Sequence, residues 1–222
     1  MQYWKGQNVS DKIKIMVMGG RTTGFHQFEI MGPIYKQFLT EAGFDVTLTE
    51  NRDDFKKEGI APYDVVICYT TGEDLTPEQA GGLLGGICGG KGFIGVHSAA
   101  DSFKQTPGYI PMVGGKFLTH PSYWPKLTFN VKNRHHPVTA GVEDFQMEEE
   151  LYLMETYGHF DVLMSTWFEG FERPITWVKA YGHGRVLYTA LGHADVQTKN
   201  ENFQKLIVNG VKWAKRPAEY RR

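Results

Sequence analysis

The chain has 222 residues, 41% of them hydrophobic, and a formal net charge of -1. This length and composition predict one α/β domain spanning residues 1–222, with its core over about 13–214. The near-zero net charge provides no electrostatic reason for nucleic acid or a membrane to be a partner. Two cysteines are too few for a disulfide framework, and residues 1–20 lack the apolar region of a signal peptide. We therefore expect a cytoplasmic protein.

The first half of the sequence alternates short apolar strands with helices. Strands are predicted over residues 13–18, 44–48, 65–69 and 93–96. A helix is predicted between the first two strands, where Gly43 is a suitable stop and Pro33 either kinks the helix or marks its beginning. A second helix is predicted over 76–88, because Thr76 and Pro77 form a strong helix start. This order predicts a parallel sheet with helices on both faces.

The second half of the sequence is richer in strands with short connections. Strands are predicted over residues 127–131, 150–155, 161–166, 174–181 and 185–191. Gly182, His183 and Gly184 indicate a hairpin turn between the last two strands. A closing helix is predicted over about 200–214 from its apolar stripe. Because no linker or internal repeat interrupts the chain, these strands are expected to be antiparallel additions to the same sheet.

A histidine occupies a strand-to-helix corner in the stretch Gly95-Val96-His97-Ser98-Ala99. Many hydrolases and transferases place a Ser or Cys nucleophile at such a corner. Ligands of open α/β sheets bind beyond the carboxyl ends of the strands, so His97 is expected to point into a solvent-reachable crevice. A histidine in that place can act as a general base, a general acid or a metal ligand.

Two other motifs do not indicate a functional site. Cys88 lies in a Gly-x-Cys-x-Gly frame, but a helix precedes it and a strand follows it, which is the reverse of a nucleophile elbow. We interpret Cys88 as a small packed residue at the end of a helix. The stretch 19–26 after the first strand lacks the Gly-x-Gly-x-x-Gly frame of dinucleotide sites, so no nucleotide cofactor is expected.

Six short stretches, in a fixed order along the chain, resemble one protein family. They are GFHQF (24–28), GGKGFIGVHSAAD (89–101), MVGGKFLTHP (112–121), HHPVTAGVEDF (135–145), EELYLM (149–154) and YGHGRVLYTALGH (181–193). Together they resemble the ThuA-like (trehalose utilisation) family over nearly the whole chain. The resemblance implies a flavodoxin-like fold of the class I glutamine amidotransferase-like superfamily, with the amidotransferase cysteine absent. It also implies carbohydrate catabolism, in particular the handling of keto-sugars derived from disaccharides.

Two positions depart from the usual pattern of the family. Glu149 and Glu150 stand where the family commonly has Asp-Glu, and His183 stands where a Lys is often found. Neither departure changes the expected fold, but both leave the choice of substrate open. Glutamine amidotransferase activity is disfavoured because the corner cysteine is missing.

Four histidines are expected at one edge of the sheet. His97, His120 and His193 fall at the ends of elements that should converge there. His26, which opens the first long helix, should approach the same edge, and the family resemblance supports its inclusion. We group these residues because the loops after parallel strands gather at one edge of a sheet.

Two carboxylates and three aromatic residues complete the predicted site. Glu150 is the best carboxylate candidate, because it and its neighbour should point to opposite faces of a strand. Asp101, four residues after the corner, can turn back along a helix and orient the imidazole of the corner histidine. Tyr109, Tyr152 and Trp124 are candidates for stacking on a sugar ring.

Two chemical interpretations of these residues stay open. In the first, His97, His120 and His193 bind a divalent metal together with a carboxylate. In the second, His97 or Glu150 removes a proton from the carbon next to a sugar ketone, so that the enolate expels a glycosidic oxygen while a neighbouring histidine polarises the ketone. The expected function is therefore an enzyme that cleaves or isomerises a keto-sugar glycoside.

A function from another class is also compatible with the sequence: a catalytically inert sugar-binding or regulatory module. In either case the expected partner is a small-molecule sugar. A separate sugar dehydrogenase would have to carry out any oxidation, because the chain has no dinucleotide motif. A homo-oligomer is compatible with the sequence.

Overall fold

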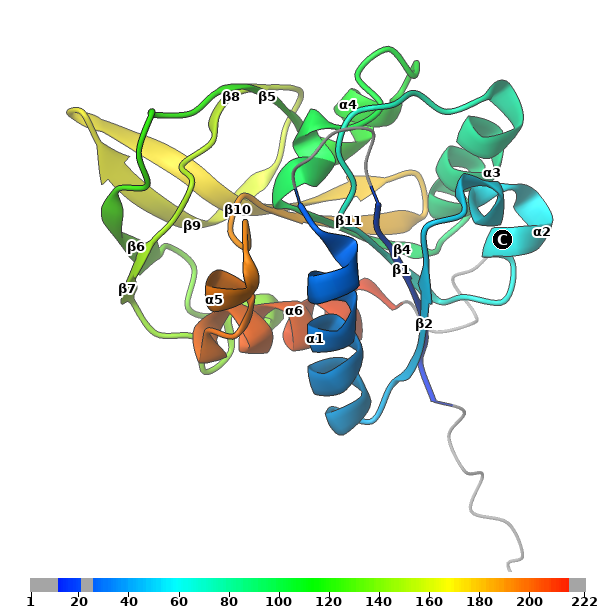
Figure 1. The fold of residues 1–222 in the computed structure, drawn as a ribbon, viewed down its shortest axis with the longest axis horizontal. Helices are drawn as coiled ribbons and strands as arrows, with labels where there is room; N and C mark the ends of the chain where they lie inside the picture. The colour runs from blue at the N-terminus through cyan, green and yellow to red at the C-terminus, as the bar shows by residue number, and fades with distance from the viewer. Residues whose placement is uncertain (1–11, 21–25, 216–222) are drawn as a thin grey trace, which may run out of the picture.

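The computed structural model describes residues 12–20 and 26–215 of the chain. Within these ranges most strands belong to one large mixed sheet, and the buried residues form one hydrophobic core cluster. Figure 1 shows the sheet passing through the middle of the molecule, with helices on both sides. The carboxyl edge of its parallel strands is where the candidate site lies.

Five parallel strands form one half of the large sheet. They are β1 (Lys14–Met18), β2 (Asp45–Thr49), β3 (Val65–Cys68), β4 (Gly92–Val96) and β11 (Gly184–Thr189). Their order is β2-β1-β3-β4-β11, which is the order of flavodoxin-like folds. The predicted flavodoxin-like α/β fold is confirmed. However, β11 was expected among the antiparallel additions and is instead the fifth parallel strand, because it pairs with β4.

Four antiparallel strands extend this sheet beyond β11. They are β10 (Phe171–Tyr181), β9 (Asp161–Phe168), β6 (Lys126–Val131) and β7 (Phe145–Glu148). They follow β11 in the order β10-β9-β6-β7. The hairpin turn predicted at 182–184 joins β10 to β11, since Tyr181 pairs with Gly184 across it. Three of these four strands were predicted, and β7 was not.

A small second sheet corrects one of the predicted strands. The strand expected over 150–155 begins only at Leu153, as β8 (Leu153–Thr156), and it does not join the large sheet. Instead β8 pairs antiparallel with β5 (Gly115–Thr119), a strand that the sequence pattern did not indicate. Residues 149–152 therefore form a connection between β7 and β8.

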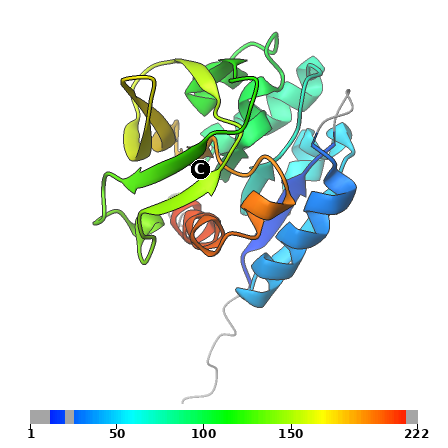
Figure 2. The same ribbon diagram turned by 60° about the vertical axis from the view of Figure 1, so that its left-hand side comes forward.

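Helices cover both faces of the large sheet. On one side lie α1 (Phe28–Glu41), α5 (Asp195–Thr198) and α6 (Glu201–Ala214), and on the other lie α2 (Lys57–Ile60), α3 (Pro77–Cys88) and α4 (Tyr109–Val113). Three single-turn helices, η1 (Arg52–Phe55), η2 (His97–Asp101) and η3 (Pro137–Thr139), lie in the connections. Figure 2 shows α1 (blue) and α6 (red) on the same side of the sheet. Because α1 begins at Phe28, Pro33 lies inside that helix and does not start it.

The start of α3 confirms a local sequence signal. Thr76 Oγ1 accepts a hydrogen bond from the backbone N–H of Gln79 at 3.3 Å, and Gln79 Oε1 accepts one from the N–H of Thr76 at 3.0 Å. This reciprocal pair is a capping box, with Pro77 as the first residue of the helix. Two of the N–H groups that a helix start leaves without partners are thereby satisfied.

The variant Thr76→Ala is expected to lower the free energy of unfolding by about 1 kcal/mol, because the helix loses its side-chain cap. Urea unfolding followed by circular dichroism measures this loss. The matched control is Thr76→Ser, which keeps the hydroxyl acceptor and should remain close to the wild type. An equal loss in both variants would contradict the capping role.

Among the residues that the structure describes, no helix is long and apolar enough to span a membrane.

Candidate active site

Four side chains from distant parts of the chain meet beyond the carboxyl edge of the parallel strands. They are His26, His97, Glu150 and His193, and one nitrogen or oxygen atom of each lies within 4.8 Å of those of the others. His26 lies two residues before the start of α1, His97 follows β4, Glu150 lies between β7 and β8, and His193 follows β11. We call this group the histidine cluster. The sheet brings it together because its parallel strands all end at this edge.

His97 is held by two hydrogen bonds, one to its imidazole and one to its backbone carbonyl. Its Nδ1 lies 2.8 Å from the carbonyl oxygen of Ala190, and its own carbonyl accepts a hydrogen bond from the Tyr188 hydroxyl at 2.8 Å. Because a carbonyl oxygen can only accept, we assign the imidazole proton to Nδ1. The lone pair of Nε2 then points at the cluster, 3.1 Å from Glu150 Oε2 and 3.0 Å from His193 Nδ1.

One expectation for His97 is wrong. The side chain does not protrude into an open crevice but is fully buried, with 0% of the residue exposed. The ring of Tyr152 lies 4.0 Å from the imidazole ring, centroid to centroid, and covers one of its faces. Only the Nε2 edge of the imidazole therefore faces reactive groups. The backbone of His97 has a φ of 44°, a left-handed value that is uncommon for a residue other than glycine.

A neutral imidazole and an ionised carboxylate give the cluster a charge distribution that favours a cation. Burial lowers the pKa of His97, which keeps this imidazole neutral. For Glu150, burial opposes ionisation, but the hydrogen bond from His193 favours it, and the pKa of the carboxyl lies well below its usual range. His193 Nδ1 lies 2.9 Å from Glu150 Oε2 and 3.0 Å from His97 Nε2. One proton on this nitrogen can therefore be shared in hydrogen bonds with both acceptors. Binding of a divalent metal by these side chains would displace that proton, because the metal needs the same lone pairs.

His26 is the member of the cluster that lies next to α1, and its imidazole contacts Thr71 and His193. Its Nδ1 lies 2.6 Å from Thr71 Oγ1, and its Nε2 lies 3.3 Å from His193 Nδ1. Its φ of 59° is also left-handed. Two histidines with such backbone angles at one site indicate that the fold holds their imidazoles in place at the expense of local backbone strain.

Glu149 is a buried residue beside the cluster whose contacts the sequence did not predict. Its side chain is buried, and burial raises the pKa of its carboxyl group, although three backbone hydrogen bonds to its oxygens oppose that shift. Glu149 and Glu150 were expected to point to opposite faces of one strand, but residues 149–152 are not in a strand. The two side chains still diverge: Glu149 binds the backbone at Gly192 and His193, whereas Glu150 faces the imidazoles.

His120 lies at the rim of the histidine cluster. Its Nε2 is 3.5 Å from Glu150 Oε1, and its Nδ1 is 2.7 Å from the carbonyl oxygen of Pro121. Its side chain is 41% exposed. The group of four therefore contains His26 in place of the His120 that was predicted to join His97 and His193 as a metal ligand.

Three predicted side-chain roles are corrected. Asp101 does not orient the imidazole of His97: it forms an ion pair with Lys104, and the carbonyl of Ala190 does the orienting. Tyr109 is fully buried and donates to the carbonyl of Ala99 at 3.0 Å, so it has no face free for a sugar. Tyr152 is only 4% exposed and lies against His97, so it supports the imidazole rather than a ligand.

Trp124, a predicted stacking residue, lies beside His193 of the cluster. It is 45% exposed, and its ring lies 4.7 Å from that of His193 in an edge-to-face arrangement. Cys88, in contrast, is exposed rather than packed. It ends α3 at the edge where β4 begins, which is the opposite edge of the sheet from His97, so it takes no part in this site.

The histidine cluster borders a pocket of about 290 Å³. The pocket is lined by His26, Gln27, Ile30, Met31, Tyr69, His193, Ala194 and Asp195. A larger groove of about 770 Å³ lies over α2 and α3 and contains no residue of the cluster. The smaller pocket thus gives a small molecule access to His26 and His193 of the cluster.

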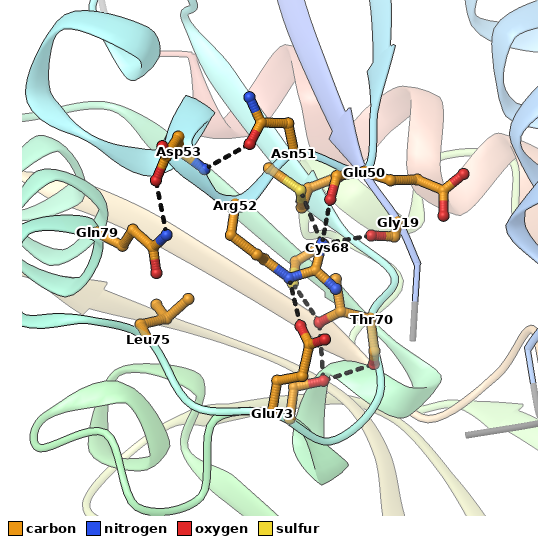
Figure 3. A network of polar contacts seen from close by, with 12 residues as sticks. Gly19, Glu50, Asn51, Arg52, Asp53, Cys68, Thr70, Glu73, Leu75 and Gln79 are labelled. Atoms are coloured by element: carbon orange, nitrogen blue, oxygen red, sulfur yellow. Dashed lines mark hydrogen bonds and ion pairs between the residues drawn. The ribbon is translucent and has the colours of Figure 1, made fainter. Parts of the chain in front are cut away.

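A separate polar network braces the same edge of the sheet, as Figure 3 shows. Arg52 Nη1 donates to the carbonyl oxygens of Gly19 at 2.6 Å and Glu50 at 3.2 Å, and Arg52 Nε pairs with Glu73 Oε2 at 3.1 Å. Gln79 Nε2 donates to Asp53 Oδ1 at 2.9 Å beside it. Since the guanidinium binds the chain directly after β1 and β2, we interpret Arg52 as a structural brace.

The fold and the site together define a class of protein: a flavodoxin-like α/β domain with a histidine at the corner directly after β4. The family model for trehalose utilisation, ThuA, matches residues 14–214. The chain therefore belongs to the ThuA family.

Solved structures of similar proteins agree with this fold. A ThuA-like protein from Parabacteroides merdae has a TM-score of 0.80 at 21% identity, with 92% of this chain and 90% of that chain covered. A ThuA-like protein from Bacteroides uniformis has a TM-score of 0.74 at 22% identity, with coverages of 96% and 95%. A cytoplasmic protein from Salmonella typhimurium has a TM-score of 0.71 at 14% identity, with coverages of 92% and 100%. No curated protein matches the chain.

Proposed function

We propose that this protein is a metal-dependent enzyme of carbohydrate catabolism that cleaves a keto-sugar glycoside. The observation that carries the proposal is the lone pair of His97 Nε2, which is directed at Glu150 Oε2 at 3.1 Å and at His193 Nδ1 at 3.0 Å. A neutral imidazole and a carboxylate oxygen both accept, so this approach is unfavourable without a shared proton or a cation. Membership of the ThuA family supports a carbohydrate as the substrate.

The side chains of the histidine cluster fit a divalent transition metal. Three imidazole nitrogens and one carboxylate oxygen suit zinc, iron, manganese or nickel. His97 also binds a backbone carbonyl through its other ring nitrogen, which is typical of a metal-bound histidine. When bound, the metal would polarise the ketone of the substrate and stabilise negative charge on its oxygen.

His120 is the group that we assign to the proton transfer. Its Nδ1 faces the carbonyl oxygen of Pro121 at 2.7 Å, so the lone pair lies on Nε2, 3.5 Å from Glu150 Oε1, and can accept a proton. In the proposed reaction Nε2 takes the proton from the carbon next to the ketone. The electron pair then forms a carbon–carbon double bond while the glycosidic carbon–oxygen bond breaks, and the leaving oxygen takes up the proton. Trp124 offers an exposed aromatic face for one sugar ring.

The test combines metal analysis with turnover. We expect about one divalent metal per chain in protein purified without chelators, and loss and recovery of keto-disaccharide cleavage upon chelation and metal addition. His120→Ala should keep the metal but lower turnover by about 10²–10⁴-fold. Unchanged turnover in the metal-free protein would instead support acid–base chemistry alone. Sugar binding without turnover of any keto-sugar would support the inert binding module.

We also propose a cytoplasmic location and a separate sugar dehydrogenase that supplies the ketone. The low cysteine count supports the location, and one of the structural neighbours is itself named a cytoplasmic protein. The absence of a dinucleotide motif from the sequence supports the need for a second enzyme.

A further inference from the structure

Glu149 connects two segments that carry members of the histidine cluster. Its Oε1 accepts hydrogen bonds from the backbone N–H of Glu150 at 3.0 Å and of His193 at 3.3 Å, and its Oε2 accepts one from Gly192 at 2.7 Å. The residue is only 1% exposed, so water does not compete for these bonds. One buried carboxylate thus holds the connection before β8 against the turn after β11.

The turn at His193 is held from both sides. Its N–H donates to Glu149, and its carbonyl oxygen accepts a hydrogen bond from the Tyr69 hydroxyl at 2.6 Å. Gly192 beside it has a φ of 98°, and a Cβ there would lie 2.9 Å from the ring of Phe203. The backbone of the turn therefore has little freedom while Glu149 is in place.

We propose that Glu149 is a positioning residue that sets the separation of Glu150 and His193, and with it the coordination of the metal. The proposal rests on the metal-binding role proposed above. His193 Nδ1 and Glu150 Oε2 are 2.9 Å apart, and each belongs to a residue whose backbone N–H binds Glu149. A carboxylate suits this position because both of its oxygens accept hydrogen bonds.

Glutamine cannot replace this carboxylate without loss. Its side chain has one acceptor oxygen, so its amide NH₂ must face either the N–H of Gly192 or those of Glu150 and His193. At least one of the two segments would then move away from the other. The neighbouring Glu148 provides a matched control, because it is exposed at the end of β7.

The experiment uses Co²⁺ as the probe, with the full chain and its visible absorption spectrum, which reports the coordination of the ion. The variants are Glu149→Gln and Glu148→Gln, with circular dichroism as the check of folding. We expect Glu148→Gln to have the wild-type spectrum and Kd. We expect Glu149→Gln to bind Co²⁺ about 10–100-fold more weakly, with an altered spectrum.

The outcomes separate this proposal from the proposed function. If wild-type protein binds no Co²⁺, the metal role and the positioning role both fail. If wild-type protein binds Co²⁺ and Glu149→Gln has the same spectrum and Kd, only the positioning role fails. Should Glu149→Gln not fold, Glu149→Asp is used, which keeps the charge but is one methylene too short to reach both segments. A wild-type spectrum and Kd in Glu149→Asp would overturn the proposal.

Discussion

If the protein binds a divalent metal as proposed, replacing His97 with asparagine is expected to abolish the stabilisation that the metal provides. Asparagine tolerates the left-handed backbone of this position, where φ is 44°. Its amide N–H can take the place of Nδ1–H opposite the Ala190 carbonyl, which accepts at 2.8 Å in the wild type. What the variant lacks is Nε2, the atom that faces Glu150 and His193.

The size of the effect follows from binding linkage. A metal at about 100 times its Kd stabilises the native wild-type protein by about 2.7 kcal/mol, since it binds the folded state alone. For a chain of this length that corresponds to a rise in Tm of roughly 5–10 °C. In His97→Asn the rise should be absent, and added chelator should leave the Tm of the variant unchanged. Differential scanning calorimetry with and without metal measures both quantities.

The control for this prediction is His135→Asn, which changes an exposed histidine outside the cluster. It should show the full metal-dependent rise in Tm. The assignment of His97 as a ligand is wrong if His97→Asn gains as much stability from the metal as His135→Asn does.

The first four parallel strands, β1 to β4, were predictable because their signals are local. The start of α3 is encoded in Thr76, Pro77 and Gln79, which lie within one helical turn of each other. The fully buried strand β3 is a continuous apolar run, Val65–Cys68, as expected for a strand with both faces covered. The position of His97 at the edge of the sheet followed from the end of β4. Local patterns therefore predicted which residues reach the edge.

The interior of the site depends on contacts that no local pattern reveals. Tyr152 covers the imidazole of His97 because Phe117 packs against its ring at 4.2 Å, and Phe117 belongs to the unpredicted strand β5. Asp101 was expected one helical turn after His97, but η2 is a single 3-10 turn, and Asp101 pairs with Lys104 instead.

Pairing between distant segments also decided which acidic and imidazole groups meet. Because β8 pairs with β5 only from Leu153 onward, residues 149 and 150 lie in a connection and do not alternate as in a strand. Glu149 could then turn towards Gly192, a contact across 43 positions of the sequence. Sequence reasoning placed Glu150 correctly near the imidazoles, but it had no signal for the partner of Glu149.

The second large effect is expected from Trp177→Ala in β10. Trp177 is fully buried, and its Nε1 donates to the carbonyl oxygen of Val113 at 2.9 Å. Its ring lies 4.8 Å from that of Phe160 and 4.5 Å from that of Tyr188, centroid to centroid. Truncation leaves a large cavity and removes the donor from a buried carbonyl, so we expect a loss of about 3–5 kcal/mol in the free energy of unfolding.

The matched control for Trp177→Ala lies in the same hairpin. Trp167 in β9 is 63% exposed, and Trp167→Ala should change the free energy of unfolding by no more than about 0.5 kcal/mol. Urea unfolding monitored by circular dichroism measures both variants. Trp177→Ala should also weaken metal binding, because Tyr188, which packs on Trp177, donates to the carbonyl of His97. Equal, small losses of unfolding free energy in the two variants would show that Trp177 contributes little to the stability of the core.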